Sequence, residues 1–141
     1  MNIDSIFQEN NLSEARILSA SDEIKIPETW SFLLTEENKD KKKTLVIERW
    51  SDFSSLLPKT LHLLEELLED VLLVFHQQQI KMVYLLLVDE EYVLYVGNMP
   101  TTDRQLALFP NKLQHFYKHL HNGWFENISG GLGLFPIEKV R

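Results

Sequence analysis

Apolar residues recur at helical spacing in two parts of this chain. Between residues 59 and 78 they occur every three or four positions, and Pro58 comes directly before them, where it suits the first turn of a helix. After Pro110 a shorter run follows the i, i+3, i+4, i+7 pattern: Leu113, Phe116, Tyr117, Leu120. We therefore predict a long helix over residues 59–78 and a short amphipathic helix after Pro110. A further short helix is expected within residues 1–12.

Runs of β-favouring residues predict strands on either side of the long helix. They cover residues 30–35, 44–50, 81–89 and 91–97. A polar loop over residues 36–43 would join the first two strands as a hairpin, and Asp89-Glu90 would form the tight turn of the second hairpin. Residues 82–88 are almost continuously apolar, which predicts a central strand covered on both faces. Residues 104–108 are expected to form a short strand.

The order of these elements predicts the fold class. Strand–strand–helix–strand–strand–helix is typical of an α+β fold. We expect a single α+β domain over residues 1–141, in which a mixed or antiparallel sheet packs against a long and a short helix, with both helices on one face. No internal repeat and no linker divides the chain.

Composition narrows the classes of function. Hydrophobic residues make up 44% of the chain and charged residues 25%, which is ordinary for a globular protein. The chain has no cysteine, so disulfides, zinc–thiolate sites and thiol nucleophiles are excluded. A net charge of −7, from 21 acidic and 14 basic residues, argues against a nucleic-acid binder. No signal peptide or membrane-spanning segment is visible, so the cytoplasm is the expected location and no membrane partner is expected.

Carboxylates gather at two places along the chain. One group falls within two turns of the predicted long helix: Glu65, Glu66, Glu69 and Asp70. The other surrounds the predicted turn: Asp89, Glu90 and Glu91. Each group reads either as a solvated surface or as a contact for a basic partner. Like charges at this spacing repel mildly, which slightly favours a partner-facing role for the first group.

The sequence contains no recognisable catalytic or phosphate-binding motif. Residues 130–133 are glycine-rich, but no Gly-Lys-Ser/Thr follows them, and no Gly-x-Ser-x-Gly occurs. His115 and His119 have the spacing that allows two histidines to share a metal on one helical face, yet Phe116 replaces the glutamate of the zincin pattern. We therefore assign no catalytic, cofactor-binding or metal-binding residue and expect no cofactor and no enzymatic activity.

The best-defined motif lies in residues 108–124. It consists of a Phe109-Pro110 pair, a helix with Phe116-Tyr117 in its middle, an Asn122-Gly123 stop, and then Trp124, which is either a core residue or an exposed anchor. This segment resembles the helix-and-turn motif of the SUKH superfamily, whose members include a fungal cell-wall-synthesis regulator and many bacterial immunity proteins. Residues 133–140 resemble the strand that follows in that family. The resemblance covers residues 108–140, whereas the family usually carries the motif near its N-terminus.

The resemblance implies a cytoplasmic immunity protein that binds and neutralises a cognate polymorphic toxin. Such toxins are often nucleases with basic surfaces, to which an acidic inhibitor is suited. The residues expected to contact the toxin are Glu65, Glu66, Glu69, Asp70, Asp89, Glu90, Glu91 and Trp124. Two alternatives stay open at this point: a small intracellular adaptor that binds a host protein or peptide, and a metal-dependent enzyme that uses His115 and His119.

Overall fold

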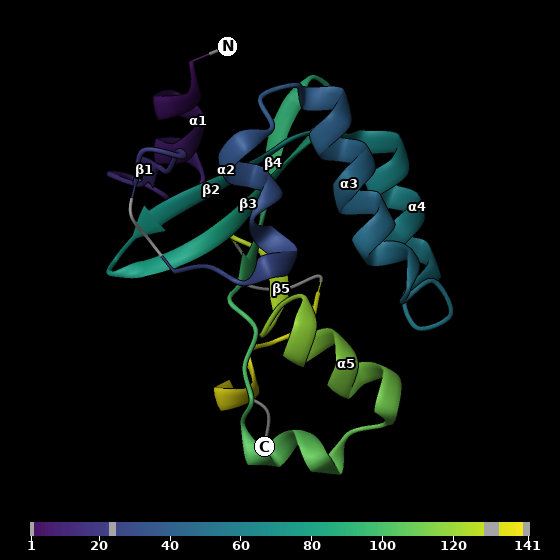
Figure 1. Ribbon diagram of the computed structural model, residues 1–141. Helices are drawn as coiled ribbons and strands as arrows, with labels where there is room; N and C mark the ends of the chain where they lie inside the picture. The colour runs from purple at the N-terminus through teal and green to yellow at the C-terminus, as the bar shows by residue number, and fades with distance from the viewer. Residues whose placement is uncertain (1, 23–24, 129–132, 140–141) are drawn as a thin grey trace.

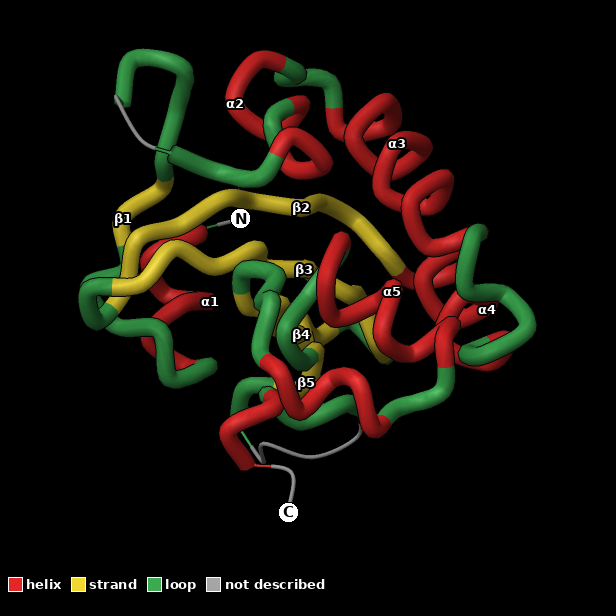
Figure 2. Tube along the Cα trace, turned by 60° about the horizontal axis from the view of Figure 1, so that its bottom comes forward, coloured by secondary structure: helices red, strands yellow, loops and turns green. Residues whose placement is uncertain are grey.

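A five-stranded antiparallel sheet forms the centre of the molecule (Figures 1 and 2). This computed structural model describes residues 2–22, 25–128 and 133–139. Within them the strands lie side by side in chain order: β1 (Arg16–Ile17), β2 (Leu68–His76), β3 (Gln79–Val88), β4 (Glu91–Asn98) and β5 (Trp124–Glu126). The predicted α+β class and antiparallel sheet are confirmed.

Helices cover both faces of this sheet. The larger layer contains α2 (Phe32–Thr35), α3 (Lys39–Ser51), α4 (Pro58–Leu67) and α5 (Asn111–His119), together with the 3₁₀ turns η1 (Glu28–Trp30), η2 (Arg104–Leu108) and η3 (Ile137–Lys139). The opposite face is covered by α1 (Ile3–Glu9), the short helix expected near the N-terminus (Figure 1). The two predicted helices, α4 and α5, lie on one face as expected, and α1 adds cover on the other. No helix in the described part of the chain is long and apolar enough to cross a membrane.

Strand β3 is the central strand that its apolar sequence predicts. Tyr84 and its neighbours Met82 and Leu86 belong to the core under α2–α5, whereas Val83 and Leu85 belong to the core under α1. Alternate side chains of a strand point to opposite faces, so one apolar run supplies both cores. The turn Asp89-Glu90 is also confirmed, with φ angles of 49° and 69° that suit a tight two-residue hairpin.

The strands predicted over residues 30–35 and 44–50 are wrong, because both segments are helical. Helix α3 begins two residues after Glu37, where the Asn38 side chain accepts a hydrogen bond from the Lys41 backbone N–H (3.0 Å). Lys42, Val46 and Trp50 are then buried at successive intervals of four. This spacing extends over about two turns of one helical face, and burial along it outweighs the local β preference of residues 44–47.

The long helix predicted over residues 59–78 is also wrong in its second half. Helix α4 ends at Leu67, and residues 68–76 form β2, which pairs with β3 along its whole length. A two-residue turn at Gln77-Gln78, with φ angles of 50° and 63°, closes this hairpin. Neither glutamine is a usual residue for such a turn, and the apolar run fits helix and strand spacing alike. The expected strand over residues 104–108 is the 3₁₀ turn η2.

A buried chain of hydrogen bonds joins four elements on the α3 side of the sheet. Trp50 Nε1 on α3 donates to the Tyr84 hydroxyl on β3 (3.0 Å), and this hydroxyl lies 2.6 Å from His121 Nε2. His121 Nδ1 lies 3.1 Å from the Asn98 carbonyl oxygen at the end of β4. A carbonyl oxygen only accepts, so Nδ1 carries the proton and Nε2 accepts from Tyr84. Every side-chain polar atom in this series of hydrogen bonds therefore has a partner.

These hydrogen bonds also fix the backbone positions around them. Any Cβ atom at position 97 would lie 2.3 Å from the His121 ring, so this position requires glycine. Trp30, at the end of η1, donates from Nε1 to the Leu120 carbonyl oxygen (3.0 Å), which holds the loop after α5 from a second direction. Trp30, Tyr84 and His121 are all fully buried. Hydrogen bonds thus hold the segment after α5 to both η1 and the sheet.

Removing the Tyr84 hydroxyl tests how much these buried hydrogen bonds contribute to stability. Tyr84→Phe leaves the Trp50 N–H and His121 Nε2 buried without partners, so we expect the free energy of unfolding to fall by about 1–3 kcal/mol. Chemical denaturation followed by tryptophan fluorescence measures this change. Tyr92→Phe is the matched control, because no hydrogen bond involves that hydroxyl within the described residues. Equal stability of the two variants would contradict the role given to Tyr84.

The fold should lose stability as the pH falls below about 6.5. Burial lowers the pKa of His121 from its ordinary 6.5 to about 3, so the folded protein keeps the ring neutral while the unfolded chain takes up a proton. The resulting stabilisation is complete above pH 6.5 and declines toward pH 3, at up to about 1.4 kcal/mol per pH unit.

Denaturation curves between pH 5 and pH 7 measure this slope. Burial lowers the pKa of His76 as well, so a His76→Gln background removes that contribution. In this background we still expect the unfolding free energy to fall as the pH is lowered. We also expect the NMR signals of the His121 ring not to titrate above pH 5. Unfolding free energies that do not change over this range would show that His121 is not held neutral.

Candidate functional site

The carboxylates expected on one helical face are divided between two elements. Glu65 and Glu66 lie in the last turn of α4 and are exposed, whereas Glu69 and Asp70 lie at the start of β2. The pairing of β2 with β3 shifts between Leu68 and Asp70, and Glu69 lies exposed at this irregularity. The expected four-carboxylate helix face is therefore wrong, because the helix ends before its second half.

Asp70 does not belong to the acidic surface at all. It is 6% exposed, and its Oδ1 lies 2.7 Å from Lys42 Nζ and accepts from the Val71 N–H (2.8 Å). Lys42 Nζ also donates to the Val71 carbonyl oxygen (3.0 Å). The carbonyl oxygen of Leu73, two residues further along β2, accepts from the Leu18 N–H beside β1. Lys42 thus continues the edge pairing of β2 where β1 ends, and Asp70 neutralises its charge.

The second predicted acidic group lies where the sequence placed it, around the β3–β4 turn. Asp89, Glu90 and Glu91 are all exposed. In the antiparallel register Leu68 pairs with Leu86, so the start of β2 and the β3–β4 turn lie at the same end of the sheet. Helix α4 runs directly into β2, so its last turn, with Glu65 and Glu66, leads to the same end. Six exposed carboxylates from the two predicted groups thus belong to segments that meet at this end: Glu65, Glu66, Glu69, Asp89, Glu90 and Glu91. The term acidic end is used below for these six residues.

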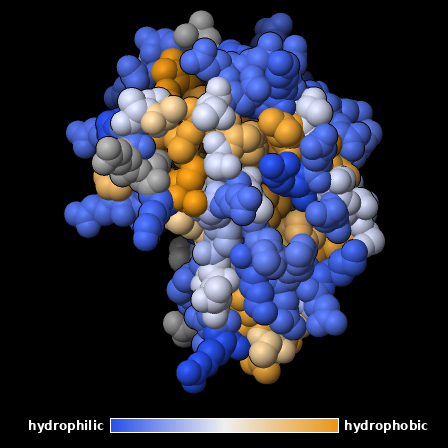
Figure 3. Space-filling model, viewed as in Figure 1, coloured by the Kyte–Doolittle hydropathy of each residue, from blue (hydrophilic) through white to orange (hydrophobic). Residues whose placement is uncertain are grey.

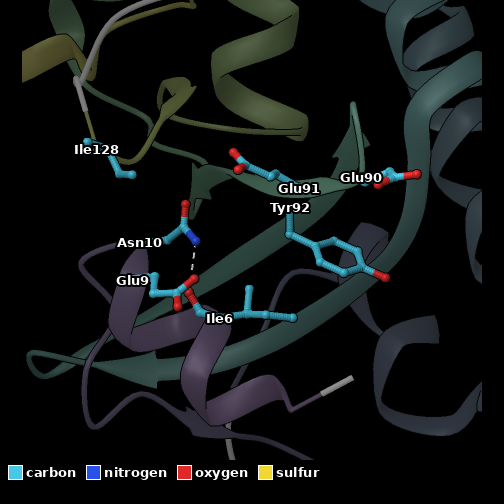
Figure 4. Close-up of a pocket in the computed structure, with 7 residues that line it drawn as sticks. All are labelled: Ile6, Glu9, Asn10, Glu90, Glu91, Tyr92 and Ile128. Atoms are coloured by element: carbon cyan, nitrogen blue, oxygen red, sulfur yellow. Dashed lines mark hydrogen bonds between the residues drawn. The ribbon is translucent and has the colours of Figure 1, made fainter.

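A hollow of about 370 Å³ lies beside the acidic end, on the face of the sheet that α1 covers. Its lining comes from three parts of the chain: Ile6, Glu9, Asn10, Glu90, Glu91, Tyr92 and Ile128 (Figure 4). The Glu91 carboxylate points toward Asn10 and Ile128, whereas the Glu90 carboxylate points to the opposite side of the turn. Two carboxylates, those of Glu9 and Glu91, therefore flank the space between α1 and β4.

The residues that α1 contributes to this hollow are absent from the sequence-based site. Phe7 packs α1 onto the sheet, and the Asn127 side chain donates to the Asn10 carbonyl oxygen (2.6 Å). The second contact joins residues 117 positions apart, and together the two contacts place Glu9 opposite the β3–β4 turn. No local pattern in the sequence indicates this pairing.

Trp124 lies in the core and not on a binding surface. It is 2% exposed, stacks on Tyr95 with ring centroids 4.2 Å apart, and meets the Trp50 ring edge-on at 4.9 Å. Such aromatic contacts account for its place directly after the turn. Of the eight residues expected to contact a toxin, Asp70 and Trp124 are thus buried, and the other six make up the acidic end.

The Asn122-Gly123 pair anchors the C-terminal segment. Helix α5 ends at His119, before Asn122, so the pair does not itself terminate the helix as the sequence suggested. Instead, Asn122 Oδ1 accepts from the Ile137 N–H (2.7 Å), and its Nδ2 donates to Glu138 (3.0 Å). Gly123 has a φ of +93°, and a Cβ there would lie 2.6 Å from the Pro136 nitrogen. The pair is therefore required by packing in this chain.

His115 and His119 lie next to each other on the exposed side of α5, with ring centroids 4.4 Å apart. They border a hollow of about 200 Å³ that Arg49 and Asp52 also line. Within the described residues, no three His, Cys, Asp or Glu side chains are grouped so that they could hold a metal ion. The pair therefore has no third protein ligand from that part of the chain.

The surface seen in Figure 3 is largely hydrophilic, with hydrophobic atoms between the polar ones in its upper half. Hydrophobic atoms also show at its lower tip, near η2, in which Leu108 is 85% exposed. No described residue covers this tip, and nothing in the structure indicates a ligand for it. We therefore take the acidic end and its hollow, which combine exposed carboxylates with a concave surface, as the candidate site.

Comparisons of the chain with protein-family models, with curated proteins and with solved structures found no match.

Loss of the Lys42 ammonium should show that Asp70 is structural. Lys42→Met leaves the Asp70 carboxylate buried without its partner and the Val71 carbonyl oxygen unpaired, so we expect a loss of about 3–5 kcal/mol of unfolding free energy. Lys41→Met is the matched control, since Lys41 is exposed and should change stability by less than about 0.5 kcal/mol. Urea denaturation measures both, and equal effects would contradict the edge-closing role of Lys42.

Proposed function

We propose that this protein binds a basic protein partner through the acidic end, in the manner of an immunity protein that neutralises a toxin domain. The observation that carries the proposal is the gathering of six exposed carboxylates, from two separate segments of the chain, at one end of the sheet. Nothing in the core requires so many like charges at one place, and their repulsion is unfavourable. A cationic partner surface would remove that cost.

The distribution of positive charge supports the same surface. Lys39 and Lys41, both exposed, lie on α3, which packs along the outer edge of β2. The hollow lies beside β4, two strands away from that edge. A basic partner that approaches from the β4 side therefore meets Glu9, Glu90 and Glu91 before it meets the lysines. Complementary charge of this kind accelerates association and orients the partner.

The resemblance of residues 108–140 to the SUKH motif is the reason why we propose an immunity protein in particular. Many members of that superfamily are immunity proteins, and a nuclease toxin would present a basic surface. The motif itself supplies core packing in this chain, through Phe116, Asn122 and Gly123. Partner binding is accordingly assigned to the acidic end and not to the motif.

Co-purification with the product of the neighbouring gene tests the proposal. We expect a complex that weakens as salt is raised, because exposed ion pairs are screened. Reversing two charges at the hollow, with Glu90→Lys and Glu91→Lys together, should raise Kd roughly tenfold or more. Isothermal titration calorimetry at two salt concentrations measures both effects.

The matched control is Glu28→Lys with Glu48→Lys, which changes the net charge equally at exposed positions on η1 and α3. This variant should bind almost as the unmodified protein does. An equal loss in both double variants would mean that only net charge matters. A salt-independent complex, or no complex with any basic protein encoded nearby, would refute the proposal.

A further inference from the structure

We infer that the hollow between α1 and the β3–β4 turn is a receptor for an arginine side chain of the partner, an inference that rests on the proposed function. The hollow is about 370 Å³, many times the roughly 30 Å³ that one water occupies in the liquid, so it admits a long side chain. Its polar lining is dominated by hydrogen-bond acceptors. A cationic donor is the group that such a lining suits.

Asn10 supplies the observation that points to a ligand. The residue is 5% exposed, and its Nδ2 donates to the Ile6 carbonyl oxygen (2.8 Å). Because a carbonyl can only accept, this bond fixes which end of the Asn10 carboxamide is oxygen. Oδ1 then points into the hollow, toward the space between Glu91 and Ile128, and no hydrogen bond to it occurs within the described residues (Figure 4). A rigid, nearly buried acceptor is thus left open to a donor from outside.

The remaining lining favours an organic cation over a metal ion. In the described part of the chain, no three acidic side chains are close enough together to hold a metal, and this includes Glu9, Glu90 and Glu91. Carboxylates spread around a wider space match a group with several separated donors. The walls between them are apolar, and come from Ile6, Ile128 and the Tyr92 ring.

Arginine fits this combination better than lysine. Its planar guanidinium carries five N–H donors in a fixed arrangement, which lets it bond Glu91 and Asn10 Oδ1 at the same time. Its methylene stem can lie along Ile6, and its plane packs readily on an aromatic ring. A lysine ammonium is a compact, strongly hydrated charge that would leave much of the hollow unfilled.

The probe for this inference is a blocked arginine, N-acetyl-arginine N-methylamide, titrated into the whole protein and followed by NMR. We expect shifts confined to the Asn10 side-chain amide and to the methyl groups of Ile6 and Ile128. The citrulline analogue, which is neutral and of the same shape, should bind at least about threefold more weakly, and the lysine analogue should also bind more weakly.

Glu91→Gln and Glu90→Gln form a matched pair of neighbours with the same change in charge. Glu91→Gln should weaken binding of the blocked arginine about three- to fivefold, because its carboxylate faces the hollow. Glu90→Gln should have a smaller effect, because its carboxylate points away. Equal effects, equal affinity for citrulline, or shifts elsewhere on the surface would overturn the inference.

The two proposals fail separately. If the blocked arginine does not bind in the hollow but a basic partner still binds through Glu90 and Glu91, the arginine receptor is wrong and the proposed function stands. If the blocked arginine binds in the hollow but no basic protein forms a salt-sensitive complex, the receptor stands as a cation site and the proposed function fails.

Discussion

The buried hydrogen-bond chain from Trp50 through Tyr84 and His121 to the Asn98 carbonyl is the constraint on which the arrangement of this protein depends. Each of its polar groups lies in a core where an unpaired donor or acceptor costs about 1–3 kcal/mol. The groups come from α3, β3, the loop after α5 and the end of β4, so all four must adopt their positions together. A shift of any one would leave partners unsatisfied, and this makes the chain a source of specificity as well as stability.

A second polar arrangement, the Lys42–Asp70 pair, covers the outer edge of the sheet at β2. Strand β1 is only two residues long, so the first half of β2 has no neighbouring strand on its outer side. Lys42 fills this place by donating to the Val71 carbonyl oxygen, and Asp70 balances its charge at 2.7 Å. The pair protects an edge that would otherwise be open to pairing with another chain. It also removes one carboxylate from the surface, so the acidic end contains Glu69 but not Asp70.

The functional surface follows from these constraints on the core. Once β2 and β3 pair in register, Glu69 and the β3–β4 turn must lie at the same end of the sheet. Packing of α1 on the opposite face then brings Glu9 and Asn10 across from Glu91. The site is therefore assembled from short segments that are unrelated in sequence, each held by core residues nearby. Its proposed preference for a basic partner, and for arginine in the hollow, arises from side chains that contribute little to folding.

The sequence by itself determined those features that depend on local periodicity and turn chemistry. It identified β3 and β4 with the turn at Asp89-Glu90, the helix after Pro110, the short helix near the N-terminus and the acidic character of the surface. In these segments the local preference and the tertiary structure agree. Only the tertiary structure decided that residues 44–50 are helical and that residues 68–76 form a strand, because their apolar residues suit either structure until a partner strand or helix buries one face. It also decided that Asp70 and Trp124 are buried, and that Asn10 faces Glu91, since charge and aromatic character do not specify exposure until distant segments are brought into contact.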